Sequence, residues 1–83
     1  MEELRNKIDK IDAEILRLFA ERMKTAKEIG EYKTANGIAV TDEKREKVVI
    51  ENARAAVPDA LSDYAEELMI KLISLSKDYQ NKI

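Results

Sequence analysis

The chain has 83 residues, 45% of them hydrophobic and 39% charged, which suits one small folded domain, and we expect that domain to span residues 1–83. Its 15 Lys and Arg oppose 17 Asp and Glu, and this net charge of −2 gives no general attraction to nucleic acid or to an anionic membrane. The sequence holds neither Cys nor His, which excludes disulfides, thiol nucleophiles, Cys/His zinc sites and imidazole catalysis.

The first residues argue against export. The start Met1-Glu2-Glu3-Leu4-Arg5 is acidic, whereas a secretory signal begins with basic residues followed by an unbroken apolar run. No stretch approaches the ~18 consecutive apolar residues of a membrane span. We therefore expect a cytoplasmic protein.

The first predicted element is a long amphipathic helix from near residue 3 to near residue 34. Gly30 lies inside it and costs about 1 kcal/mol relative to Ala, which is tolerated where something must approach the backbone closely. Asn36-Gly37 is expected to end the helix. Apolar residues recur along it in steps of three, four or twice four, at Leu4, Ile8, Ile11, Ile15, Leu18, Ala26 and Ile29.

Two shorter helices are predicted after the first. The run Thr41-Asp42-Glu43 indicates the start of one, because a capping residue followed by acids suits the positive end of a helix dipole, and this helix should reach about Arg54. The other opens after Pro58-Asp59 and should continue to the end of the chain. Its apolar stripe is formed by Leu61, Ala65, Leu68, Leu72, Leu75, Tyr79 and Ile83. With no strand signal, the predicted fold is all-α, with three helices per chain.

The length of the first helix predicts an assembly of two chains. At about 1.5 Å per residue it would extend about 48 Å, whereas a compact chain of this size has a radius of gyration of about 12 Å. Its apolar stripe runs nearly the whole length, so the two shorter helices are too small to cover it. We therefore expect an intertwined homodimer in which a second copy covers the stripe.

Polar residues interrupt the inward faces of all three predicted helices. Helical steps from Leu18 reach Arg22 and later Lys33, which places two cations at core-facing positions. Taken singly, such residues are more simply explained as snorkelling or solvated side chains. Jointly they indicate a missing anionic ligand, because buried cations without matching anions are costly and Arg grips carboxylates through two hydrogen bonds. The inward faces of the two shorter helices carry further polar residues of this kind: Asp42, Arg45, Glu46, Ser76 and Gln80.

Several runs of residues cover almost the whole chain in a specific order and spacing. They are Leu4-Arg5-Asn6-Lys7-Ile8-Asp9, Ile11-Asp12, Leu18-Phe19-Ala20-Glu21-Arg22, Ile29-Gly30-Glu31-Tyr32-Lys33, Val40-Thr41-Asp42-Glu43-Lys44-Arg45-Glu46 and Ser76-Lys77-Asp78-Tyr79-Gln80. Each run is a weak signal alone, but the set resembles the all-helical class of chorismate mutases. The family often has Pro where Ala39 stands, a departure that loosens the loop before the second helix and leaves the chemistry intact.

The resemblance implies a dimer that rearranges chorismate to prephenate, a step towards phenylalanine and tyrosine, with no cofactor and no metal. It implies that Arg5 from the partner chain, Arg22 and Arg45 clamp the two carboxylates of the substrate, with Ser76 assisting. The implied catalytic residues are Lys33 and Gln80, which donate hydrogen bonds to the ether oxygen, and Glu46, which holds the ring hydroxyl together with the backbone at Asp42. This pericyclic shift needs neither a nucleophile nor a general base, so the lack of His and Cys fits it.

Two other functions remain open from the sequence. Isochorismate-pyruvate lyases share the fold, but they carry an apolar residue after the arginine of the second helix, where this chain has Glu46. A non-catalytic helical dimerisation module would keep its charges on outer faces, and Arg22 on the apolar stripe argues against that function.

Overall fold

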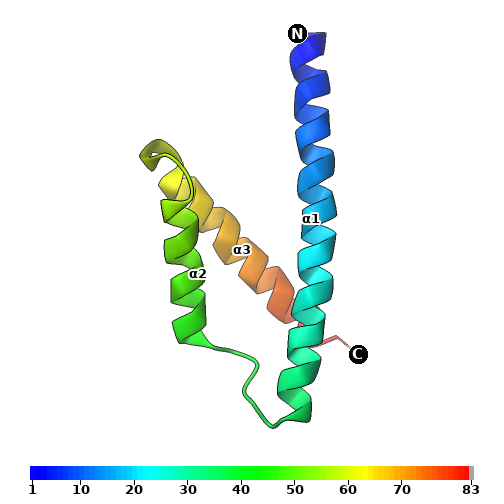
Figure 1. Ribbon diagram of the computed structural model, residues 1–83, viewed down its shortest axis with the longest axis vertical. Coiled ribbons are helices and arrows are strands. Elements are labelled where there is room, and N and C mark those ends of the chain that lie inside the picture. The colour runs from blue at the N-terminus through cyan, green and yellow to red at the C-terminus, as the bar shows by residue number, and fades with distance from the viewer. Residues whose placement is uncertain (83) are drawn as a thin grey trace.

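A computed structural model describes residues 1–82, and its regular elements over that range are all helices (Figure 1). They are α1 (Glu2–Ala35), α2 (Glu43–Ala55), the short 3₁₀ helix η1 (Asp59–Leu61) and α3 (Ser62–Gln80). The prediction of an all-α chain with one long and two shorter helices is confirmed. The third helix, predicted to continue to the end of the chain, ends at Gln80, and Ile83, the last residue of its predicted apolar stripe, lies outside the described residues. No helix in the described range is both long and apolar enough to cross a membrane.

Local sequence sets where the helices begin and end. The carboxylate of Asp42 accepts a hydrogen bond from the backbone N–H of Arg45 at 3.1 Å, which satisfies one of the free donors at the start of α2. After α1, Gly37 adopts a φ of 67°, a left-handed conformation that glycine takes without strain. Both boundaries were predicted from the sequence and are confirmed, but the capping side chain of α2 is Asp42 and not the preceding Thr41, which the sequence pattern placed as the cap.

Helices α2 and α3 lie side by side and run in opposite directions (Figure 1). Arg54, near the end of α2, donates from Nη1 to Asp63 Oδ1 at 2.9 Å and to Glu66 Oε1 at 3.1 Å. The Asp63 carboxylate beside it raises the pKa of Arg54. Ser62 adds a hydrogen bond from its hydroxyl to the Arg54 carbonyl at 3.2 Å. These contacts connect the start of α3 to the end of α2.

The C-terminal half of α3 packs against the C-terminal half of α1, where Ala26 and Gly30 are buried. Gln80 donates from Nε2 to the carbonyl oxygen of Ala26 at 2.7 Å. A Cβ added at Gly30 would lie 3.0 Å from Cγ of Gln80 and 3.2 Å from its Cβ. Gly30 therefore permits the close approach that its place inside a helix suggested.

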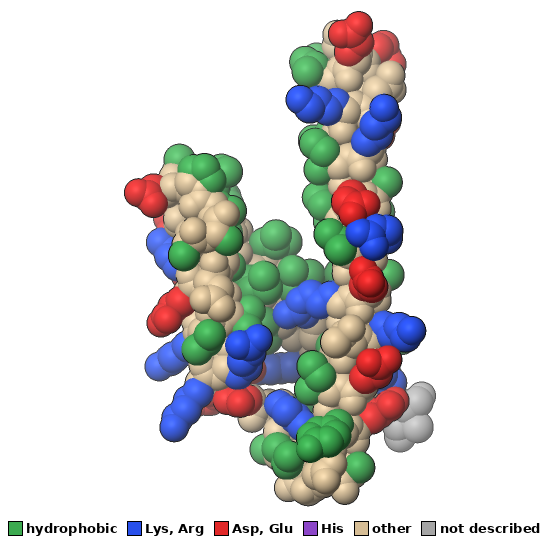
Figure 2. Space-filling model, in the orientation of Figure 1, with side chains coloured by type: hydrophobic (Ala, Val, Ile, Leu, Met, Phe, Trp, Pro, Cys, Tyr) green, Lys and Arg blue, Asp and Glu red, His purple; other side chains and the backbone are tan. Residues whose placement is uncertain are grey.

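The N-terminal half of α1 extends beyond the other two helices (Figure 1). The radius of gyration is 15.3 Å, above the ~12 Å of a compact chain of this length. Leu4, Ile8 and Ile15 of the apolar stripe are 65%, 53% and 55% exposed, and Figure 2 shows hydrophobic side chains along this projecting part. A single chain thus leaves a continuous apolar stripe open to solvent, which is unusual for a monomeric protein.

We expect Gly30→Ala to destabilise the folded protein. The added Cβ overpacks the contact with Gln80, which should lower the free energy of unfolding by about 1–3 kcal/mol. The higher helix propensity of Ala should raise it by at most about 1 kcal/mol. Denaturant unfolding at fixed protein concentration measures the net effect, with exposed Glu31→Ala as the control for propensity. If the Gly30→Ala protein were more stable than the unsubstituted one, α3 would be able to shift away from α1 without loss of stability, contrary to this expectation.

Candidate active site

A cavity of about 500 Å³ opens between the three helices and the segment that precedes α2. Its wall includes every site residue predicted from the sequence except Arg5: Arg22, Lys33, Asp42, Arg45, Glu46, Ser76 and Gln80. Leu18, Ile29, Val49 and Ile73 add apolar surface. The cavity therefore offers charged groups beside an apolar wall, which suits a small organic anion.

Arg22 reaches from α1 across to α3. Its Nη1 donates to the hydroxyl oxygen of Ser76 at 2.5 Å, and the Ser76 hydroxyl lies 2.7 Å from the carbonyl oxygen of Leu72. Ser76 is buried, at 7% exposure, and Arg22 is half-buried. The guanidinium is thus held inside the cavity by a neutral partner, and Arg22 does not snorkel to bulk water.

Lys33 connects the end of α1 to the loop before α2. Its Nζ donates to the carbonyl oxygen of Val40 at 3.3 Å, and the side chain is half-buried. This partner is also neutral, so the contact holds the ammonium at the edge of the cavity without an opposing charge.

Gln80 lies where α3 ends against α1. One N–H of its amide is engaged by Ala26, and a carboxamide has a second N–H to donate. Lys27, one residue after Ala26, steadies this last turn of α3 by donating to the carbonyl oxygens of Tyr79, at 3.3 Å, and Lys82. The Lys27 ammonium also lies 5.1 Å from the centre of the Tyr79 ring. A cation at a helix C-terminus is favourable, so this contact stabilises the position of Gln80.

Arg45 and Glu46 enter the cavity from the first turn of α2, just after the Asp42 cap. Arg45 is exposed and Glu46 is half-buried. Glu46 pairs through Oε2 with Nζ of Lys77 at 2.7 Å. Lys77 was not among the residues predicted from the sequence, because it directly follows Ser76 and so lies off the predicted polar line of α3.

Arg5 does not lie in the cavity of its own chain. It is exposed in the first turns of α1, where Nη1 lies 3.6 Å from Glu2 Oε1. At 1.5 Å per residue, the straight helix separates it from Arg22 by about 25 Å. A chain folded in this way is unable to bring its own Arg5 to its own cavity.

Four cations, Arg22, Lys33, Arg45 and Lys77, face three acids, Glu21, Asp42 and Glu46, on the cavity wall. Figure 2 shows Lys and Arg side chains gathered in the hollow between α1 and α2. The three acids of the wall are engaged elsewhere: Asp42 caps α2, Glu46 pairs with Lys77, and Glu21 pairs with Arg17. Arg22 and Lys33 bond to neutral oxygens. Within residues 1–82, acidic side chains form no group of three that is spaced to hold a metal ion. The arrangement suits an organic anion with carboxylate groups.

Comparison with known proteins gives one family. The model of the family "Chorismate mutase type II" matches residues 4–81. A chorismate mutase of Methanocaldococcus jannaschii is 38% identical over 73 residues, which cover 88% of this chain and 72% of the relative. A bifunctional chorismate mutase/prephenate dehydratase of Aquifex aeolicus is 47% identical over 51 residues, which cover 61% of this chain and 14% of that protein. No solved structure matches the chain significantly.

We expect sulfate to raise the melting temperature more than chloride does at equal ionic strength. Sulfate bound beside Arg22 and Lys33 stabilises only the folded state, by about 2.7 kcal/mol at a hundredfold excess over its dissociation constant. Thermal unfolding at fixed protein concentration measures the difference between the two salts. Arg22→Met should abolish that difference, and Lys10→Met, on the exposed part of α1, should keep it. If the two salts raised the melting temperature of the unsubstituted protein equally, the cause would be charge screening and not anion binding.

Proposed function

This chain belongs to the chorismate mutase type II family, its activity is the isomerisation of chorismate to prephenate, and we propose that the cavity between α1, α2 and α3 is where this reaction takes place. The observation that carries the proposal is the convergence of Arg22, Lys33, Arg45 and Gln80, from three helices, on one cavity. The family match and the relative named chorismate mutase favour this function over a lyase or a non-catalytic dimerisation module.

The proposed task of Arg22 and Arg45 is to bind the two carboxylates of chorismate. Guanidinium groups form paired, charge-assisted hydrogen bonds to carboxylates, and the bond from Arg22 to Ser76 supports this by holding one guanidinium at the cavity wall. A flexible dianion gripped at both ends is restricted to the compact geometry in which its reacting carbons meet. For a unimolecular rearrangement, this restriction is itself a large part of catalysis.

The proposed task of Lys33 and Gln80 is to stabilise the ether oxygen. Negative charge grows on this oxygen as the carbon–oxygen bond breaks and the carbon–carbon bond forms, so donors aimed at it act mainly in the transition state. Lys33 offers an ammonium, and Gln80 offers the N–H that is not bonded to Ala26. Their support from Val40 and Ala26 fixes both side chains before the substrate arrives.

Glu46 is the proposed acceptor for the ring hydroxyl, together with the backbone at Asp42. A carboxylate accepts at two oxygens, so Glu46 can receive the hydroxyl through Oε1 while Oε2 faces Lys77. None of these tasks needs a nucleophile, a general base or a cofactor, because the electrons move within chorismate itself.

We further propose that two chains form an intertwined homodimer in which each site receives Arg5 from the partner. The apolar stripe on the projecting half of α1 is exposed in one chain, and burial against a second copy would remove it from water. Arg5 lies on that same half, about 25 Å along the helix from Arg22. The surface that needs a partner thus carries the residue that the single-chain cavity lacks.

Residues 1–83 are proposed to form one domain, which is supported by a family model that matches residues 4–81. Its partners are chorismate and a second copy of the chain, with the cytoplasm as the proposed location. The net charge of −2 gives the chain no general attraction to nucleic acid or to anionic membranes, and neither is proposed as a partner.

Gln80→Met should lower turnover by about a hundredfold or more, the size of effect seen when one oxyanion donor is removed. Methionine keeps a stem against Gly30 and removes the amide, so the Michaelis constant should change less than turnover. Loss of chorismate absorbance measures both constants, and Asn81→Ala is the control for a neighbouring exposed amide. Unchanged turnover in folded Gln80→Met protein would remove Gln80 from the mechanism.

Mixed dimers test the shared site. Arg5→Ala and Arg45→Ala homodimers should both be nearly inactive, because each lacks one carboxylate clamp in every site. After co-refolding, about half of the dimers are mixed and each has one intact site, so about a quarter of the unsubstituted activity should return. If the two arginines served the site of the same chain, every site would keep one defect and the mixture would stay inactive.

A further inference from the structure

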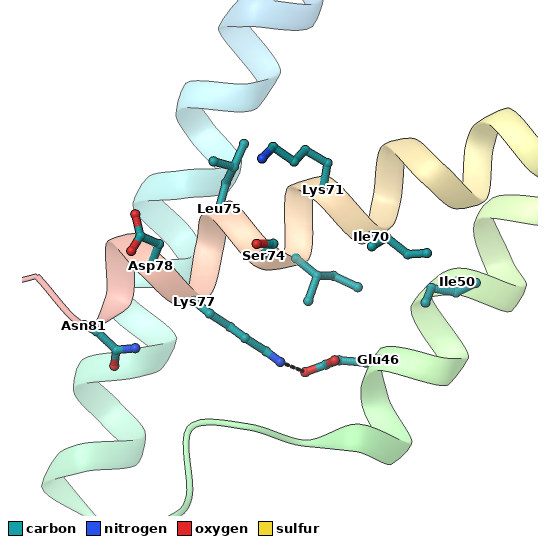
Figure 3. Close-up of a pocket in the computed structure, with 10 residues that line it drawn as sticks. Glu46, Ile50, Ile70, Lys71, Ser74, Leu75, Lys77, Asp78 and Asn81 are labelled. Atoms are coloured by element: carbon teal, nitrogen blue, oxygen red, sulfur yellow. Dashed lines mark ion pairs between the residues drawn. The ribbon is translucent and has the colours of Figure 1, made fainter.

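Lys77 is a charged residue of the cavity that the proposed chemistry does not use. It follows Ser76 on α3 and lines both the cavity and a second groove of about 600 Å³ between α2 and α3. Figure 3 shows its side chain crossing from α3 to α2, where Nζ lies 2.7 Å from Oε2 of Glu46. The ion pair therefore lies between two hollows and joins two helices.

The pair is partly shielded from water. The side chains of Lys77 and Glu46 are 36% and 28% exposed. Shielding strengthens the attraction between the two charges compared with a fully exposed pair. The contact is thus able to hold Glu46 in one orientation.

The orientation of Glu46 has to be fixed because charged side chains surround it in the cavity. An unpaired carboxylate in this cavity would repel a dianionic substrate, or would turn towards the cations Arg22, Lys33 and Arg45, which also line the cavity. If the Glu46 carboxylate turned towards these cations, it would pair with the side chains that are proposed to bind the substrate. Asp42, another acid of the cavity wall, is already held by its cap bond to the Arg45 N–H.

We propose that Lys77 is a positioning residue for the mutase reaction: it offsets the charge of Glu46 and holds Oε2, so that Oε1 accepts the ring hydroxyl and the arginines stay free. This inference rests on the proposed role of Glu46. Lys77 acts through Glu46 and does not itself touch the substrate.

Lys77→Met should lower kcat/KM by about tenfold, within the range of coupling between residues in direct contact. Lys77→Arg, which keeps the charge, should restore most of the activity. Lys71→Met is the matched control, because Lys71 lies on the same helix and lines the same groove but points away from Glu46 (Figure 3). An equal loss in Lys71→Met, or no loss in Lys77→Met, would overturn the inference.

A double-mutant cycle tests the route through Glu46. In a Glu46→Gln background, Lys77→Met should change kcat/KM by less than about twofold, because the group that Lys77 holds has lost its charge. A full tenfold loss in that background would show that Lys77 acts independently, which overturns the inference and leaves the role of Glu46 intact. An inert Glu46→Gln single substitution would overturn both. Thermal unfolding checks each variant, and Lys77→Gln replaces Lys77→Met if the latter does not fold.

Discussion

The site depends on the close contact between the end of α3 and the second half of α1. Gly30 removes the Cβ that would hold the helices apart, and Gln80 uses the space to reach the Ala26 carbonyl. Lys27 stabilises this contact by donating hydrogen bonds to main-chain carbonyl oxygens at the end of α3. With this crossing fixed, Ser76 comes within reach of Arg22 one helical turn earlier on each helix. A packing contact thus also determines the geometry of the polar groups.

The two cations of α1 that line the cavity, Arg22 and Lys33, are held by neutral oxygens, and this choice of partner determines what the cavity attracts. A carboxylate opposite Arg22 or Lys33 would cancel its charge, whereas the Ser76 hydroxyl and the Val40 carbonyl fix the side chain and leave the charge in place. The burial of these cations is therefore compensated only in part within the chain. In the proposed complex an anionic substrate would supply the rest, which would link the electrostatics of folding to those of binding.

Assembly and catalysis are linked through α1 in the proposed dimer. One half of this helix builds the cavity, and the other half presents exposed apolar side chains together with Arg5. Burial of that stripe against a second copy is driven by the hydrophobic effect, which is insensitive to substrate. The charged contribution of Arg5 would then be in place before chorismate binds, so no conformational change is needed to complete the carboxylate clamp.

The sequence by itself determined the helices, because apolar periodicity, the Asp42 cap and Gly37 are local signals that each act within a few residues. It also indicated the inward faces, and hence Arg22, Lys33 and Gln80 as candidates. Only the tertiary structure decided which side chains meet: Arg22 with Ser76, Gln80 with Ala26, and Lys77 with Glu46. Periodicity gives the face of each helix but neither the angle nor the register at which two helices cross. Lys77 was missed for that reason, since its role depends on the position of α2 and not on its own helix.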